Sequence, residues 1–184
     1  MEWGKVSGAD SYKVYAAYCG SKFALVKTVK GSAKCKVTIK KLNGKKLSPT
    51  KNIKVYVAAY QKVRVEENGK TVLKDVRLAK TIPGHVIGKK NKEYSNAKKI
   101  KLSKKSYTLK KGKKAKIQAK TVLEYPKRKQ LSDAHAKEFR YASTDKSVAY
   151  VDKKGRIVAK KKGSCTIYIY ARNGLARKIK VMVS

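Results

Sequence analysis

The stretch "STDKSVAYVDKKGRIVAKKKGSCTIYIYARNGLARKIKVMV", residues 143–183, decides how this chain folds. Apolar and polar residues alternate in it with a period of two, which sends successive side chains to opposite faces of a β-strand. Turn-forming residues separate its runs: Lys154-Gly155, Gly163 and Asn173-Gly174. The many lysines therefore indicate strands with charged outer faces rather than a basic tail or a nucleic-acid patch.

The same alternation continues through the rest of the chain. It runs through segments rich in Val, Ile, Tyr and Thr, at residues 11–18, 23–31, 35–42, 52–60, 71–81 and 115–122. No window of about twelve residues has the i, i+3, i+4, i+7 spacing of an amphipathic helix. We therefore predict an all-β protein built from short strands, as in a sandwich or a barrel.

A polar segment in the middle of the chain, residues 90–109, indicates a domain boundary. A new strand pattern begins within this segment, so we predict two tandem β-sandwiches at residues 1–99 and 100–184. Each half is close to the roughly 100 residues of an immunoglobulin-like unit.

The charge of the chain is extreme. Lys and Arg number 49 against 11 Asp and Glu, which gives a net charge of +38, and only seven of the cations are Arg. Such an excess attracts polyanions, which include anionic cell-wall polymers, anionic lipid and, at low salt, nucleic acid without sequence preference. The predominance of Lys over Arg argues against sequence-specific base recognition.

The second half resembles the bacterial immunoglobulin-like group 2 domain, the invasin/intimin-type module. The resemblance rests on Ser143, Val148, Ala149, Val151, Gly155, Ile157, Ala159, Gly163 and Thr166, and on Leu109 and Gly112 before the second strand. It implies an immunoglobulin-like sandwich of the kind found in secreted or wall-associated proteins of Gram-positive bacteria.

The first half resembles a fibronectin type III domain. Trp3, the small-residue loop at residues 7–10, Tyr12 and Val14 follow that family's pattern, and residues 38–42 and 52–60 are similar to its E and F strands. Ile53 stands where the family has a tyrosine, and the A strand before Trp3 is missing. We therefore expect a fragment of a longer protein, with a signal sequence in the part upstream.

Residues suited to catalysis or metal binding are few, and we predict no catalytic residue, no metal and no cofactor. Cys165 lies on the same inward face of its strand as Ile167, which indicates a core residue. Cys19 and Cys35 each lie near a strand end, and the sequence does not decide whether they form a disulfide. The most metal-like segment, residues 132–139, holds Asp, His and Glu within a strongly positive neighbourhood, which disfavours a cation.

Two groups of outward-facing aromatic residues are candidate binding sites. Lys13 and Tyr15 on one strand face Lys54, Tyr56 and Tyr60 on its expected neighbour, and Tyr168 and Tyr170 share the outer face of a strand in the second half. Flat rings beside cations can stack on sugars or bases. The alternative is that tyrosine is frequent here because it favours strands and pairs across them.

These features lead to one predicted function and two alternatives. We predict a non-catalytic, extracellular adhesion or spacer module pair of a bacterial surface protein, associated with anionic wall polymers or host glycans through its lysines. One alternative is an accessory region of a secreted enzyme. The other is a non-specific binder of polyanions, including nucleic acid.

Overall fold

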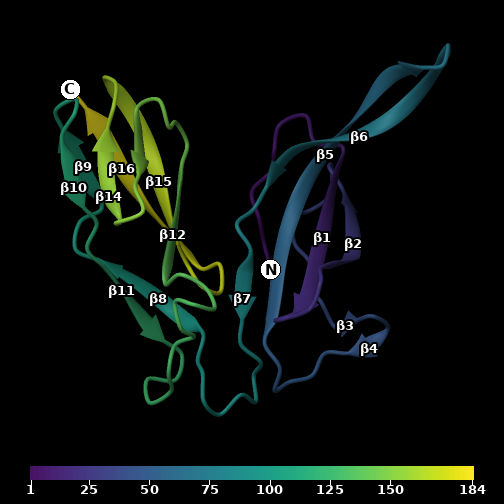
Figure 1. Cartoon of the computed structure of the whole chain (residues 1–184), viewed down its shortest axis with the longest axis horizontal. Helices are drawn as coiled ribbons and strands as arrows, with labels where there is room; N and C mark the ends of the chain where they lie inside the picture. The colour runs from purple at the N-terminus through teal and green to yellow at the C-terminus, as the bar shows by residue number, and fades with distance from the viewer. The chain divides into compact units, whose positions relative to one another are not determined.

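The computed structural model describes residues 1–184 as strands, turns and irregular segments without a helix (Figure 1). The chain divides into two compact units, Met1–Asn91 and Lys92–Ser184. The predicted break between residues 99 and 100 falls inside β8 (Ala97–Leu102), which pairs with β11 (Ala119–Leu123). A domain boundary does not separate a strand from its own sheet, so the division lies before β8.

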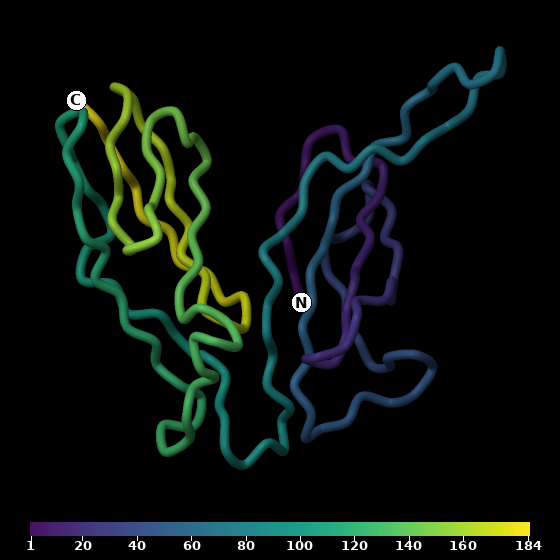
Figure 2. The backbone as a smooth tube through the Cα atoms, viewed as in Figure 1, coloured from purple at the N-terminus to yellow at the C-terminus, as the bar shows by residue number.

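The first unit is built on one antiparallel sheet in the order β2-β1-β5-β6, with β7 also paired to β5. The strands are β1 (Ser11–Tyr18), β2 (Ala24–Lys30), β5 (Ile53–Glu67), β6 (Lys70–Lys80) and β7 (Gly84–Val86). The β5–β6 hairpin projects beyond the rest of the unit (Figure 2). Its turn residues, Asn68 and Gly69, have φ angles of 50° and 71°, which the favoured two-residue hairpin turn requires.

The second layer of this unit is less regular than predicted. The strand expected at residues 35–42 forms only as β3 (Lys41–Leu42), paired with β4 (Lys45–Lys46), and as an isolated bridge between Glu2 and Lys36. Met1 and Val37 exchange two hydrogen bonds beside this bridge, and the Leu47 amide donates to the Lys40 carbonyl, but no ladder connects the two places.

The core of the first unit lies between these two layers. The inward side chains of β1 and β5 form it: Tyr12, Val14, Ala16, Val55, Val57 and Ala59. Half-buried side chains of the second layer pack on them, among them Trp3, Val37 and Ile39. The Tyr12 hydroxyl accepts a hydrogen bond from the Val6 amide at 2.8 Å. This bond satisfies the one polar atom of an otherwise apolar, fully buried side chain.

Three sheets make up the second unit. A four-stranded sheet has the order β12-β15-β16-β9, a three-stranded sheet has the order β10-β14-β13, and β8 pairs with β11. The strands not yet placed are β9 (Ser106–Leu109), β10 (Lys114–Lys116), β12 (Phe139–Ser143), β13 (Ala149–Val151), β14 (Arg156–Ala159), β15 (Gly163–Ala171) and β16 (Ala176–Val183). The strand expected at residues 115–122 is divided, because β10 pairs with β14 whereas β11 pairs with β8.

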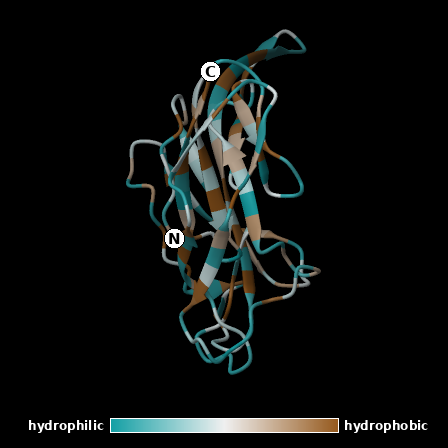
Figure 3. Cartoon of the chain, turned by 90° about the vertical axis from the view of Figure 1, so that its left-hand side faces the viewer, coloured by the Kyte–Doolittle hydropathy of each residue, from teal (hydrophilic) through white to brown (hydrophobic).

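Hydrophobic and hydrophilic residues alternate along the strands, as the sequence predicted (Figure 3). Ile157, Ile167, Ile169 and Ile179 are fully buried in the core of the second unit. Cys165 packs among them, which confirms that it lies on the inner face of its strand.

Candidate functional site

Aromatic side chains gather on the face of the first unit's sheet that points away from the core. Tyr15 of β1 and Tyr56 of β5 are directly opposite in the strand register. Their rings stack with centroids 4.8 Å apart and an interplanar angle of 14°. Phe23 packs edge-on against Tyr56 at 4.7 Å, and the Tyr15 and Tyr60 hydroxyls lie 3.5 Å apart.

Lysine ammonium groups lie over these rings. Lys80 Nζ is 4.3 Å from the Tyr56 centroid, Lys54 Nζ is 4.6 Å from that of Phe23, and Lys13 Nζ is 4.6 Å from that of Tyr60. We call this set of seven residues the aromatic–lysine face: Lys13, Tyr15, Phe23, Lys54, Tyr56, Tyr60 and Lys80. Five of them were predicted from the sequence, whereas Phe23 and Lys80 were not.

The charge of the aromatic–lysine face is only partly neutralised within the chain. Lys13 forms an ion pair with Asp75 at 2.6 Å, whereas Lys54 and Lys80 form none. The hydrogen bond with Tyr60, together with burial, raises the pKa of Tyr15 to about 12, so this phenol is neutral at physiological pH. The net charge of the face is therefore positive and comes from its lysines.

The contacts among these side chains determine what the face can bind. Tyr56 is in contact with a second ring, an edge-on Phe and an ammonium group, so a sugar could stack on it only by displacing Lys80. The cation–π contacts restrict the lysine stems and keep their ammonium groups near the surface. The arrangement is better suited to phosphate, carboxylate or sulfate groups than to a neutral sugar ring.

The other two predicted aromatic residues lie in the second unit. Tyr168 and Tyr170 of β15 have ring centroids 6.2 Å apart at 28°. Tyr168 is opposite Lys178 of β16, and Tyr170 is opposite Arg140 of β12. The Arg140 guanidinium donates to two backbone carbonyls, those of Ala171 and Arg172, so it contributes to the structure of this sheet end.

The acidic cluster at residues 132–139 is occupied by interactions within the protein. Asp133 Oδ1 accepts hydrogen bonds from Arg172 Nη2 at 2.6 Å and from the Glu138 amide at 3.0 Å. Glu138 Oε1 accepts one from the Thr121 hydroxyl at 2.8 Å. Arg172 also donates to Gln130 Oε1 and to a backbone carbonyl, so these acids hold a loop in place.

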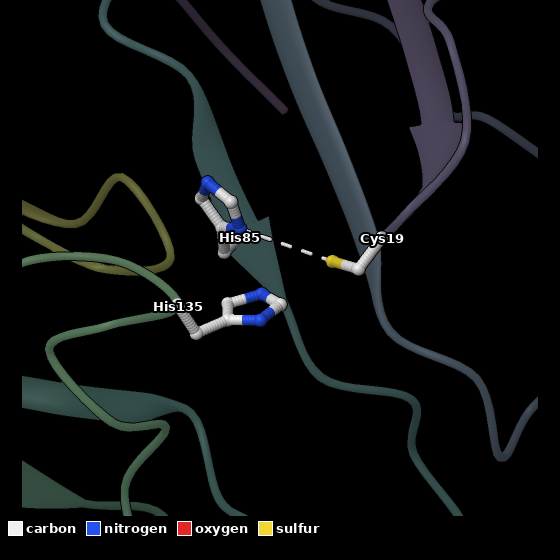
Figure 4. A group of neighbouring side chains, drawn as sticks. All are labelled: Cys19, His85 and His135. Carbon is white, nitrogen blue, oxygen red and sulfur yellow. Dashed lines mark hydrogen bonds between the residues drawn. The ribbon is translucent and has the colours of Figure 1, made fainter.

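The three cysteines are free, so Cys19 and Cys35 do not form a disulfide. Cys19 Sγ instead lies 3.8 Å from Nδ1 of His85 (Figure 4). Burial raises the pKa of the Cys19 thiol, and the nearby charge of Lys54 partly opposes this effect. His135, drawn in the same figure, belongs to the second unit.

The second unit combines a core of buried isoleucines with an edge strand, β9, that runs parallel to β16. Residues 96–181 match the family model of the bacterial Ig-like domain (group 2). The matched range contains all the residues on which the resemblance to this family rests, from Leu109 to Thr166. The fibronectin type III resemblance of the first unit stays a prediction.

Several solved structures are similar to the chain at 16% sequence identity. Domains 4 and 5 of the S-layer protein SbsC match with a TM-score of 0.40, covering 72% of this chain and 64% of that one. The structure of rSbsC(31-844) matches with a TM-score of 0.41, covering 98% of this chain and 21% of that one. The chain thus spans less than two thirds of each of these proteins. No curated protein matches it, and it has no helix long and apolar enough to cross a membrane.

Proposed function

We propose that this chain is a non-catalytic module pair of a bacterial surface protein that holds anionic polymers at the aromatic–lysine face. The observation that carries the proposal is that Lys54 and Lys80 lie over aromatic rings and have no acidic partner. The bacterial Ig-like domain in the second unit supports a place at the bacterial surface.

The polymer would be recognised in two steps. The net charge of +38 attracts any polyanion at long range, and this attraction weakens as salt screens it. At short range, positioned ammonium groups bind anionic groups at a lower entropic cost than freely rotating lysines do. Phosphate-rich wall polymers and sulfated or carboxylated host glycans share this chemistry, so the experiment includes both.

The test compares two double variants that remove the same charge from the first unit. Lys54→Gln with Lys80→Gln alters the aromatic–lysine face, and Lys45→Gln with Lys46→Gln alters two exposed lysines of β4. Binding to wall teichoic acid, heparin, duplex DNA and a neutral polysaccharide is measured at about 0.15 M salt.

We expect the face variant to lose several-fold more affinity for its anionic polymer than the β4 variant does. The anionic polymer that the parent chain binds most tightly shows whether the ligand is a wall polymer or a host glycan. Equal losses for the two double variants, or undiminished binding by the face variant, would mean that the charge acts diffusely, and the proposal would fail.

A further inference from the structure

The contact between Cys19 and His85 joins two segments that are far apart in the sequence. Cys19 directly follows β1, where its amide donates to the Asn52 carbonyl at 2.9 Å. His85 lies on β7, paired with Lys54 of β5. Because β1 and β7 both pair with β5, the sheet itself holds the thiol and the imidazole together.

The spacing of the two ligand atoms fits a single metal ion. Zinc binds cysteine sulfur at about 2.3 Å and histidine nitrogen at about 2.0–2.1 Å in tetrahedral geometry, which places two such ligand atoms about 3.5 Å apart. Sγ of Cys19 and Nδ1 of His85 are 3.8 Å apart, so a small side-chain rotation suffices. Thiolate and imidazole are also the ligands that zinc and related thiophilic metals select.

We propose that Cys19 and His85 are two protein ligands of a binding site for a zinc-class divalent metal ion. The thiol releases its proton to solvent as the metal–sulfur bond forms, and neutral His85 supplies the lone pair of Nδ1. Water or a donor group of another molecule completes the coordination. This inference does not depend on the proposed polymer binding.

The surroundings of the pair limit the affinity. Lys54 is paired with His85 in the strand register, and its charge acts on Cys19. Its ammonium group repels a divalent cation, and two protein ligands are fewer than the three or four of typical zinc sites. We therefore expect a weaker site than a structural zinc site, one that tightens when the charge of Lys54 is removed.

The test uses the full chain, reduced, with Cys35→Ser as the background so that the other partly exposed thiol does not bind the probe. Cd²⁺ is titrated and the ultraviolet thiolate-to-cadmium band is followed, and Zn²⁺ is then added as a competitor. We expect one Cd²⁺ per chain, displaced by Zn²⁺. Loss of a group that only hydrogen-bonds to a metal ligand costs about 10- to 100-fold in metal affinity. Loss of a ligand itself, in His85→Ala, should therefore weaken binding at least about tenfold.

Further variants separate a metal site from an incidental contact. Cys19→Ser should abolish the band, and Lys54→Gln should increase the affinity. In the unmutated chain, Zn²⁺ should shift the NMR resonances of the His85 ring, a readout that requires no variant to fold. A band that persists in Cys19→Ser, an unchanged affinity in His85→Ala, or a His85 ring unaffected by Zn²⁺ would overturn the proposal.

Discussion

Gly31, at the end of β2, shows how much the first unit depends on single positions. A Cβ at this residue would lie 1.9 Å from the carbonyl oxygen of Ala9, a distance that no side chain tolerates. The Gly31 amide donates to the Asp10 carbonyl at 2.8 Å, so the backbone cannot withdraw without losing this bond. This close approach joins the end of β2 to the start of β1, the strand that carries Lys13 and Tyr15.

Gly31→Ala should therefore lower the free energy of unfolding of the first unit by about 2 kcal/mol or more, through overpacking and backbone displacement. Gly4→Ala is the matched control, because a Cβ at Gly4 would have no atom within 4 Å, and it should change stability by less than about 0.5 kcal/mol. Denaturant unfolding followed by the fluorescence of Trp3, the single tryptophan of the chain, measures both. Equal unfolding midpoints would contradict the steric argument.

At the scale of elements, the β13–β14 hairpin shows how a lysine-rich stretch becomes ordered structure. Oδ1 of Asp152 accepts hydrogen bonds from the amides of Lys154 and Arg156 at 2.9 and 3.0 Å. Its Oδ2 accepts one from Nε of Arg156 at 2.8 Å. Asp152 therefore closes the turn, while Ile157 and Ala159 enter the core beyond it.

The same bonds predict how this hairpin responds to acid. The hydrogen bond from the Arg156 amide, together with the one from the Arg156 guanidinium, lowers the pKa of Asp152, and burial opposes this effect only in part. Its folded pKa is thus below the unfolded value of about 3.9. The stability it contributes is present in full above the unfolded value and is lost as the pH falls through the folded one.

NMR titration of the Asp152 carboxyl should show a pKa below the ordinary value. Unfolding measured between about pH 5 and pH 2 should depend less on pH in Asp152→Asn than in the parent chain. Titration of Asp152 at or above the ordinary value would show that the turn bonds do not favour the charged carboxylate.

At the scale of the whole molecule, the lysine coat opposes folding. A net charge of +38 on 184 residues repels itself, and the 11 acids are too few to neutralise it. Most lysines are exposed, so this repulsion is reduced by dissolved salt.

Raising the salt concentration from about 0.01 M to about 0.15 M shortens the Debye length from about 30 Å to about 8 Å. We expect the thermal midpoint to rise by about 2 to 4 °C, equivalent to about 1 kcal/mol. Differential scanning calorimetry at the two salt concentrations measures it. A midpoint that stays constant or falls would show that self-repulsion contributes little.

Much of the fold follows from the sequence alone. Alternation with a period of two acts within a strand, and it identified β1, β2, β5, β6, β15 and β16 and the inward position of Cys165. Alternation predicts short strands less well. Residues 115–122 alternate regularly as one segment, yet they contribute to two strands that lie in different sheets.

The candidate site was predictable only in part, for a related reason. Tyr15 and Tyr56 were expected to face each other because their strands were expected to be neighbours, and the structure stacks them. Phe23 directly precedes β2 and Lys80 ends β6, and both reach the stacked pair across strand pairings whose register shifts, which no local pattern encodes. Cys19 and His85 meet only because β1 and β7 both pair with β5. Strand character and inward or outward direction are local properties of a sequence, whereas proximity between distant side chains depends on sheet order and register, and these exist only in the folded chain.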